Sequence, residues 1–468
     1  MVIDQKLKSE IDNMLMNYEK KYFKIARDLA LGITKKFPND TLAWKILGAT
    51  YSQIGQLKNS LRANQKVIEL TPHDAEAYSN LGVTFEMLER FDEAVESYKK
   101  AINLNSEYVM AYNNLGVVLQ KLNRIEEAEI NYKKSIALKP DYVEAYYNLG
   151  NIYLSLEKFE EAIKKYSQAL ELNPKYIPAQ ENLISILTYF SPNNEIKNPI
   201  VIVNNSIKKI KNDFTLNDGI KINELTNFFE NSNRIIQDKI KKVQYNKTQI
   251  YRTNTTNLNC QRHFKVFDKH QIIPKFCFNC FKIQIEPKNV LGLINLFFIF
   301  DKLKLTHNNI RKCMIEFRPN VVEPYKGLIY CTTIDEANEI LQTVSPIINK
   351  LIKCKIKIKR GCTEYGEVFP DYKKVDKTSK GFMKYKEEWS EKEKNFDLTQ
   401  NKAVINPRVS LKGISVSDIL IMNNWLSYAK MINDFSYKEI YKDINISNYI
   451  SKIISEQLDL RKENFNNN

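Results

Sequence analysis

A motif that recurs every 34 residues constrains the fold of this chain more than any other feature of its sequence. Each copy has an aromatic residue, then Leu-Gly at the third and fourth positions after it, then a small residue near the middle. The four aromatic residues are Trp44, Tyr78, Tyr112 and Tyr146. A constant period of this length predicts helical hairpins stacked in an array, because one hairpin alone cannot bury its apolar face.

The periodic pattern also sets the boundaries of the array. We place the repeats at 41–74, 75–108, 109–142 and 143–176. A degenerate copy at 7–40 precedes them, and only Ala26 and Pro38 keep its register. Residues 177–189 are predicted to form one further inner helix that covers the exposed end of the stack.

The repeats resemble the tetratricopeptide repeat family, and they are similar to the repeats of O-GlcNAc transferases. The resemblance covers a little over a third of the chain. It implies an α-helical superhelix, or α-solenoid, whose concave groove holds an extended peptide or a helix of a partner protein. The glycosyltransferase region of those enzymes has no counterpart that we find in this sequence.

A ladder of asparagines is the first candidate binding feature. Asn80, Asn114, Asn148 and Asn182 recur at one offset, and each is expected on an inner helix. A side-chain amide offers donors and an acceptor, so such a ladder can hold a peptide backbone without reading its side chains. Asparagine also occupies this offset in repeats that bind nothing through it. The neighbouring residues are expected to share the groove, namely Asn113, Tyr147, Asn151, Glu86, Gln120 and Met110.

Length and composition indicate further domains after the repeats. Asn, Lys and Ile dominate 191–259, which we interpret as a helical or low-complexity linker, and 260–372 holds all seven cysteines. A charged segment with C-terminal helices follows at 373–468. Residues 1–200 carry 25 Lys and Arg against 26 Asp and Glu, so residues 201–468 carry a net charge of +16 while the whole chain carries +15. That asymmetry is compatible with a nucleic-acid partner or with a compositional bias of the genome.

The pattern within 260–372 is strand, helix, strand, strand, helix, strand, which predicts a ferredoxin-like α+β domain with a four-stranded antiparallel sheet. The expected strands are 276–285, 312–318, 326–331 and 353–360. The expected helices are 290–303 and 334–352.

Two close pairs, Cys260 with His263 and Cys277 with Cys280, have the spacing of a structural zinc site. The second pair lies in an apolar segment, where cysteine also serves as a small hydrophobic residue. Cys313 and Cys331 are alternative partners in the neighbouring strands.

One face of the last predicted strand consists of lysines, namely Lys353, Lys355, Lys357 and Lys359. Lysines on an edge strand discourage pairing with another molecule. They also form a candidate anion-binding surface. The segment from Lys326 to Tyr330 has a partial likeness to the RNA-recognition motif, but Leu328 stands where an aromatic residue would stack a base.

The sequence therefore predicts a cytoplasmic scaffold or adaptor that binds protein through its repeats. We recognise no catalytic motif and no apolar run long enough to span a bilayer, which favours a role other than catalysis. Two alternatives remain open. One is a nucleic-acid-associated adaptor that uses the basic half, and the other is an enzyme with its site in the Cys-rich domain.

Overall fold

A computed structural model describes residues 2–193, 195–211, 214–240, 243–252, 260–307, 309–318, 321–376, 378, 380–398, 409–442 and 448–455. Residues 253–259, which end the predicted linker, and residues 456–468 lie outside the described ranges. The chain divides into two compact units, Met1–Pro174 and Lys175–Asn468.

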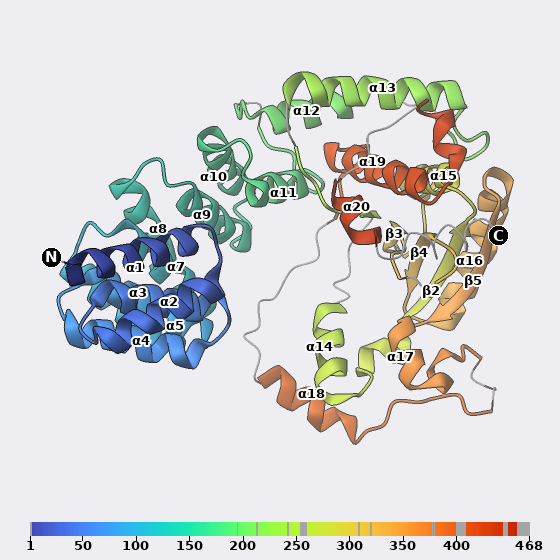
Figure 1. Ribbon diagram of the computed structural model, residues 1–468. Coiled ribbons are helices and arrows are strands. Elements are labelled where there is room, and N and C mark those ends of the chain that lie inside the picture. Colours follow the sequence, from blue (N-terminus) through green and yellow to red (C-terminus); the bar gives the residue numbers. More distant parts are fainter. Residues whose placement is uncertain are drawn as a thin grey trace. The chain divides into compact units, whose positions relative to one another are not determined.

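The first unit consists of five helical hairpins (Figure 1). Its helices are α1 (Val2–Glu19), α2 (Phe23–Lys36), α3 (Thr41–Gln53), α4 (Leu57–Leu70), α5 (Ala75–Met87), α6 (Phe91–Leu104), α7 (Val109–Lys121), α8 (Ile125–Leu138), α9 (Val143–Ser155) and α10 (Phe159–Leu172). The prediction of stacked hairpins is confirmed. The degenerate copy is a full hairpin, and Met14, Ala30 and Ile33 of that hairpin share a core with Ala43 and Leu47 of the next.

The turn inside each hairpin contains one residue with a left-handed backbone conformation, and these residues follow one another at intervals of 34 positions. These residues are Lys21, Gly55, Glu89, Asn123 and Glu157, with φ between 57° and 76°. A left-handed residue reverses the chain after a helix, and only glycine adopts it without steric cost. The recurrence at Lys21 shows that the first hairpin keeps the register of the array.

Packing inside the hairpins explains the repeated Leu-Gly. A Cβ atom on Gly82, Gly116 or Gly150 would lie 2.6–2.7 Å from the ring of a buried tyrosine on the second helix. The three tyrosines are Tyr98, Tyr132 and Tyr166, each 0% exposed. Glycine therefore permits an aromatic ring to fill the seam between the two helices. At Gly48 the opposing residue is Asn64, which instead donates to the hydroxyl of Thr84 at 2.8 Å.

The second unit mixes helices with one sheet. It contains α11 (Ile177–Ile186), α12 (Pro199–Lys208), α13 (Ile222–Lys239), β1 (Gln249–Arg252), α14 (Cys260–His270), the 3-10 helix η1 (Lys275–Asn279), β2 (Phe281–Pro287), α15 (Val290–Lys302), β3 (Arg311–Ile315), β4 (Tyr325–Cys331), α16 (Ile334–Leu351), β5 (Cys354–Arg360), α17 (Thr363–Val368), η2 (Pro370–Lys373), α18 (Trp389–Leu398), α19 (Val416–Met431), η3 (Phe435–Glu439) and α20 (Asn448–Ile454). Among these, α11 contacts α19, so the helix predicted to cap the repeats packs within the second unit.

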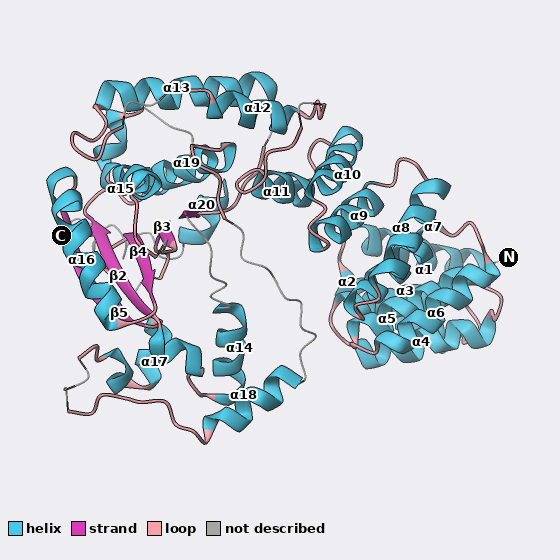
Figure 2. Cartoon of the chain, turned by 180° about the vertical axis from the view of Figure 1, so that it is seen from behind, coloured by secondary structure: helices cyan, strands magenta, loops and turns pink. Residues whose placement is uncertain are grey.

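The five strands form an antiparallel sheet in the order β1-β3-β4-β2-β5. Helices α15 and α16 contact the strands and each other, and Figure 2 shows α16 alongside β2 and β5. A Cβ on Gly327 of β4 would collide with Leu296 of α15, so Gly327 faces the helices. Because side chains alternate along a strand, its neighbours Lys326 and Leu328 lie on the opposite face.

The sheet differs from the expected one in two respects. Strand β1 is a fifth strand that the sequence did not reveal. Strand β2 begins at Phe281 rather than at 276, because Pro274 precedes a 3-10 helix over Lys275–Asn279. Cys277 therefore lies in a turn of that helix and not in a strand.

A further layer of helices packs over the side of the sheet on which α15 lies. Helix α19 contacts α15 and β1 as well as α12 and α13, and Figure 1 shows α12 and α13 lying side by side beyond it. Buried Arg252 connects the layers, because its guanidinium binds Asp301 of α15 at 2.7 Å and Asp418 of α19 at 2.8 Å. Asp418 also closes the capping box that begins α19.

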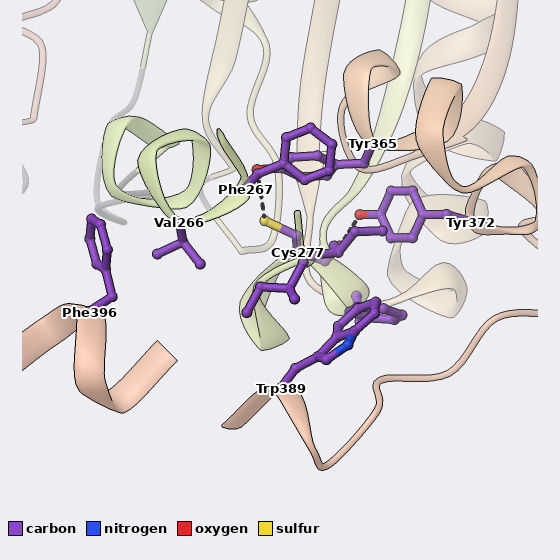
Figure 3. Close-up of a cluster of buried hydrophobic side chains, with 10 residues drawn as sticks. Val266, Phe267, Cys277, Tyr365, Tyr372, Trp389 and Phe396 are labelled. Atoms are coloured by element: carbon purple, nitrogen blue, oxygen red, sulfur yellow. Dashed lines mark hydrogen bonds between the residues drawn. The ribbon is translucent and has the colours of Figure 1, made fainter. Parts of the chain in front are cut away.

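At one end of the sheet, aromatic side chains form a separate small core (Figure 3). The phenol of Tyr372 donates to the backbone carbonyl of Cys277 at 2.6 Å, and the Cys277 thiol donates to the hydroxyl of Tyr365 at 3.8 Å. Helix α18 adds Trp389 and Phe396 to this cluster. The cluster holds α14, α17 and α18 together around η1.

Candidate functional site

The first helices of the hairpins form a continuous layer in the first unit. Helices α3, α5, α7 and α9 contact one another in order. Side chains 35 residues apart meet across this layer: Lys121 of α7 binds Glu86 of α5 at 2.8 Å. We call the surface of these four helices that carries such pairs the inner face.

Three asparagine amides on the inner face form a hydrogen-bonded chain. Asn148 of α9 donates through Nδ2 to Oδ1 of Asn113 at 3.0 Å. Asn113, which is buried, donates in turn to Oδ1 of Asn114 at 3.3 Å. Among the described residues, Oδ1 of Asn148 and Nδ2 of Asn114 make no hydrogen bond. The chain thus ends in one acceptor and one donor on half-buried side chains.

The other predicted ladder residues lie apart from this chain. Asn80 of α5 is half-buried, and its side-chain amide makes no hydrogen bond within the described part of the protein. Asn182 lies in α11, which belongs to the second unit. The structure therefore brings Asn148, Asn113 and Asn114 together, and it places Asn80 one helix further along.

Buried tyrosines fix the remaining predicted groove residues. Tyr132 donates to Oε1 of Gln120 at 3.3 Å, and Tyr166 donates to Oδ1 of Asn151 at 2.7 Å. The ring of Tyr147 lies 5.9 Å from that of Tyr166. Burial raises the pKa of Tyr132, so its hydroxyl remains a donor at neutral pH. These contacts hold the polar groups of the inner face in set positions.

Glu86 was expected in the groove from the sequence, whereas Lys121 was not; both belong to the inner face. Glu86 accepts a hydrogen bond from buried Tyr98 at 3.3 Å, just as Gln120 does from Tyr132 one repeat later. Glu86 and Gln120 each lie twelve residues before a buried tyrosine, so they occupy equivalent positions in consecutive repeats. Because Lys121 neutralises Glu86, this part of the surface carries no net charge.

The predicted zinc ligands occupy three different local structures. Cys260 begins α14, His263 lies within it, Cys277 lies in η1 and Cys280 follows η1. The imidazole of His263 stacks on Phe276 at 5.1 Å, and burial lowers its pKa to about 4. In the described part of the chain, no group of three or more His, Cys, Asp or Glu side chains is arranged to hold a metal ion. The zinc site stays a prediction.

Acidic side chains form ion pairs with some of the lysines in the row on the last strand. Lys353 precedes β5, which lies at an edge of the sheet as expected. Lys355 binds Glu323 at 3.3 Å, and Lys357 binds buried Glu286 at 2.8 Å. Lys359 is half-buried. The row is therefore not a uniform free cationic surface.

An acidic side chain also forms an ion pair with the lysine of the segment that partly resembles the RNA-recognition motif. Buried Lys326 binds Glu316 at 2.9 Å, and Gly327 faces α15. Neither residue presents a free cation or a stacking surface on the sheet.

Comparison with protein families identifies the repeats. The tetratricopeptide repeat model matches residues 143–176, and a second TPR model matches 87–123 and 121–156. The hairpins within residues 87–176 are therefore tetratricopeptide repeats, as the sequence predicted. A search of curated proteins found no match for the chain.

Several solved structures are similar to part of the chain. A crystal structure of MamA is 31% identical over 34% of this chain and 94% of its own, with a TM-score of 0.31. TTC0263, a thermophilic TPR protein of Thermus thermophilus, is 24% identical over 39% of this chain and 98% of its own, with a TM-score of 0.36. YrrB, described as a TPR protein with an unusual peptide-binding site, is 19% identical over 36% and 88%, with a TM-score of 0.31.

A search of the described helices for membrane spans gave a negative result. None of them combines the length and the apolar character that a bilayer crossing requires.

Proposed function

We propose that this protein is an interaction scaffold whose inner face binds an extended segment of a partner protein. The observation that carries the proposal is the amide chain from Asn148 through Asn113 to Asn114, which ends in an acceptor and a donor. An extended peptide presents the matching pair, one N–H and one C=O, at each residue. This proposal includes the similarity to the repeats of O-GlcNAc transferases, which bind extended segments through asparagines.

The chemistry of the surface favours a neutral or mixed segment over an acidic tail. Lys121 is bound to Glu86, so it does not offer a free ammonium to a carboxylate. The predicted ladder and groove residues of the surface are otherwise mainly amides, whose hydrogen bonds are largely independent of charge. The tyrosines behind Gln120 and Asn151 reduce the ordering cost of binding, because these side chains are already held.

The test is a peptide selection followed by substitution of the ladder. Random peptides displayed on phage are selected on the full chain, and the affinity of the best peptides is measured by fluorescence anisotropy. The double substitution Asn114→Ala and Asn148→Ala is expected to weaken binding about ten-fold or more, since each lost hydrogen bond contributes about 1 kcal/mol.

Asn103→Ala is the matched control, because Asn103 is exposed on the second helix of its hairpin. It should leave affinity unchanged. Thermal unfolding of both variants shows whether the repeats remain folded. Equal affinity of wild type and the folded double variant would remove the inner face from the proposal.

We further propose that residues 281–360 form a ferredoxin-like unit. The order β3-β4-β2-β5 supports it, because that fold places its first and third strands in the middle of the sheet and follows each of them with a helix, as α15 follows β2 and α16 follows β4. Strand β1 then adds a fifth strand beside β3. Such a unit hosts many functions, so its role depends on its side chains and not on its topology.

A further inference from the structure

The face of the sheet opposite α15 and α16 carries an unusual number of lysines. We call it the lysine face. It consists of Lys282, Lys312, Lys326, Lys355, Lys357 and Lys359, together with Glu286, Glu316, Tyr251 and Tyr330. The register supports the grouping, because Lys282 of β2 pairs with Lys359 of β5 and with Tyr330 of β4. Lys312 of β3 pairs with Tyr251 of β1.

The acids of the lysine face gather at one end of the strands. Glu286 binds Lys357 and Glu316 binds Lys326, both at separations below 3.0 Å. Arg318 also binds Glu316 at 2.8 Å. These contacts neutralise the end of the face that lies near the end of β2.

The other end of the lysine face has no such compensation at two of its lysines. Lys282 is 7% exposed, its ammonium lies 3.3 Å from the sulfur of Cys362, and it sits 5.1 Å from the ring centre of Tyr330. The ammonium of Lys312 lies 5.4 Å from the ring centre of Tyr251. Within the described part of the chain, neither lysine forms an ion pair.

A partly buried cation without an adjacent anion is energetically unfavourable. Its charge also lowers the pKa of the neighbouring lysines. Burial, and then the charge of Lys282, lowers the pKa of Lys312 to about 8. Burial, followed by Lys282 and Lys326, lowers the pKa of Lys359 to about 8. Desolvation and like charges both disfavour the protonated amine. Glu316, the carboxylate that acts on Lys312, is already bound to Arg318 and Lys326.

We propose that Lys282, Lys312 and Lys359 form a binding site for a small oxyanion, such as the phosphate or carboxylate group of a metabolite. An anion seated there would supply the charge that the protein does not place beside Lys282 and Lys312. Lysine serves as a point charge toward such groups. Tyr251 and Tyr330 flank the site and would limit the ligand to a compact group. The residues of the site come from three strands at one end of the sheet, which fits one anionic group better than a nucleic-acid backbone.

Lysine acylation can test the site in the full chain. The protein is treated briefly with acetic anhydride near pH 8, and the modification of each lysine is read by peptide mass spectrometry. Inorganic phosphate and malonate are the two probes, and single-stranded RNA is the competing polyanion; each is compared with sodium chloride at equal ionic strength. Either probe is expected to slow modification of Lys312 about three-fold or more, because bound anion keeps the amine protonated.

Lys350 is the internal control, since it is exposed at the end of α16. Its modification should not respond to either probe. Protection by phosphate alone indicates a phosphorylated ligand, and protection by malonate alone indicates a carboxylate.

Two variants complete the test. Lys282→Met is expected to abolish protection of Lys312, and Lys359→Met, at the edge strand, provides the same test if the first variant does not fold. Lys350→Met should retain full protection. The proposal is overturned if neither anion protects Lys312 beyond chloride, if single-stranded RNA alone does so, or if protection survives in the folded Lys359→Met variant.

Discussion

Replacing a glycine of the repeats by alanine should change the stability of its hairpin in opposite directions at two positions. Gly116→Ala adds a Cβ that would lie 2.7 Å from the ring of Tyr132, which is fully buried and cannot swing away. Gly32→Ala, in α2, adds the same atom where nothing lies within 4 Å. Both glycines are helical, so the intrinsic helix preference changes equally at the two sites.

The magnitudes follow from two terms. Alanine favours the helix over glycine by about 1 kcal/mol. Overpacking a core position costs about 1–3 kcal/mol. Gly32→Ala should therefore stabilise its hairpin by up to about 1 kcal/mol. Gly116→Ala should destabilise its hairpin by up to about 2 kcal/mol, because a contact of 2.7 Å with a buried ring makes the steric cost exceed the gain in helix preference.

Hydrogen–deuterium exchange resolves the two effects locally, which matters because a chain with two units need not unfold in one step. Peptides from α7 and α8 should exchange faster in the Gly116→Ala variant. Peptides from α2 should exchange more slowly in the Gly32→Ala variant. If both variants shift in the same direction, the packing of Tyr132 does not explain the repeated glycine.

Two further predictions concern buried charges of the second unit. Arg252→Met should cost about 3–5 kcal/mol in unfolding by urea, because it leaves the carboxylates of Asp301 and Asp418 buried without their partner; a loss below about 1 kcal/mol would contradict this. Glu316 is buried, and although desolvation opposes it, Arg318 and Lys326 lower its pKa to about 2. The stabilisation from a lowered carboxyl pKa is complete above the unfolded value near 4.5 and is lost as pH falls toward 2. The difference in stability between wild type and Glu316→Gln should therefore shrink over that interval, and a constant difference would be the opposing result.

The sequence predicted those parts of the fold that depend on local periodicity. The Gly and Tyr positions of the repeats are spaced regularly, so the hairpins and their seams could be placed before the structure was known. The alternation in 353–360 likewise predicted strand β5, and the expected ferredoxin-like strand order placed it at a sheet edge. Contacts between distant segments were less accessible. Strand β1 has only four residues. Its buried Arg252 binds two carboxylates that lie 49 and 166 residues away in the sequence.

The candidate sites show the same limit. The asparagine offset pointed to the inner face, but it did not reveal that Asn113 links Asn148 to Asn114. Lys282 lies in an apolar strand, and nothing nearby in sequence indicates that its partners across the sheet are Tyr330 and Lys359. The acids that neutralise the lysine row come from other strands and loops, so spacing along one strand could not show which lysines they bind.

The binding of a peptide to the inner face is the central claim, and an exchange footprint tests it most directly. Deuterium uptake of the full chain is measured with and without a phage-selected peptide. We predict that protection is concentrated in α5, α7 and α9, and that it disappears in the Asn114→Ala, Asn148→Ala variant. Protection confined to residues 281–360, or protection that is unchanged in the folded variant, would contradict the account.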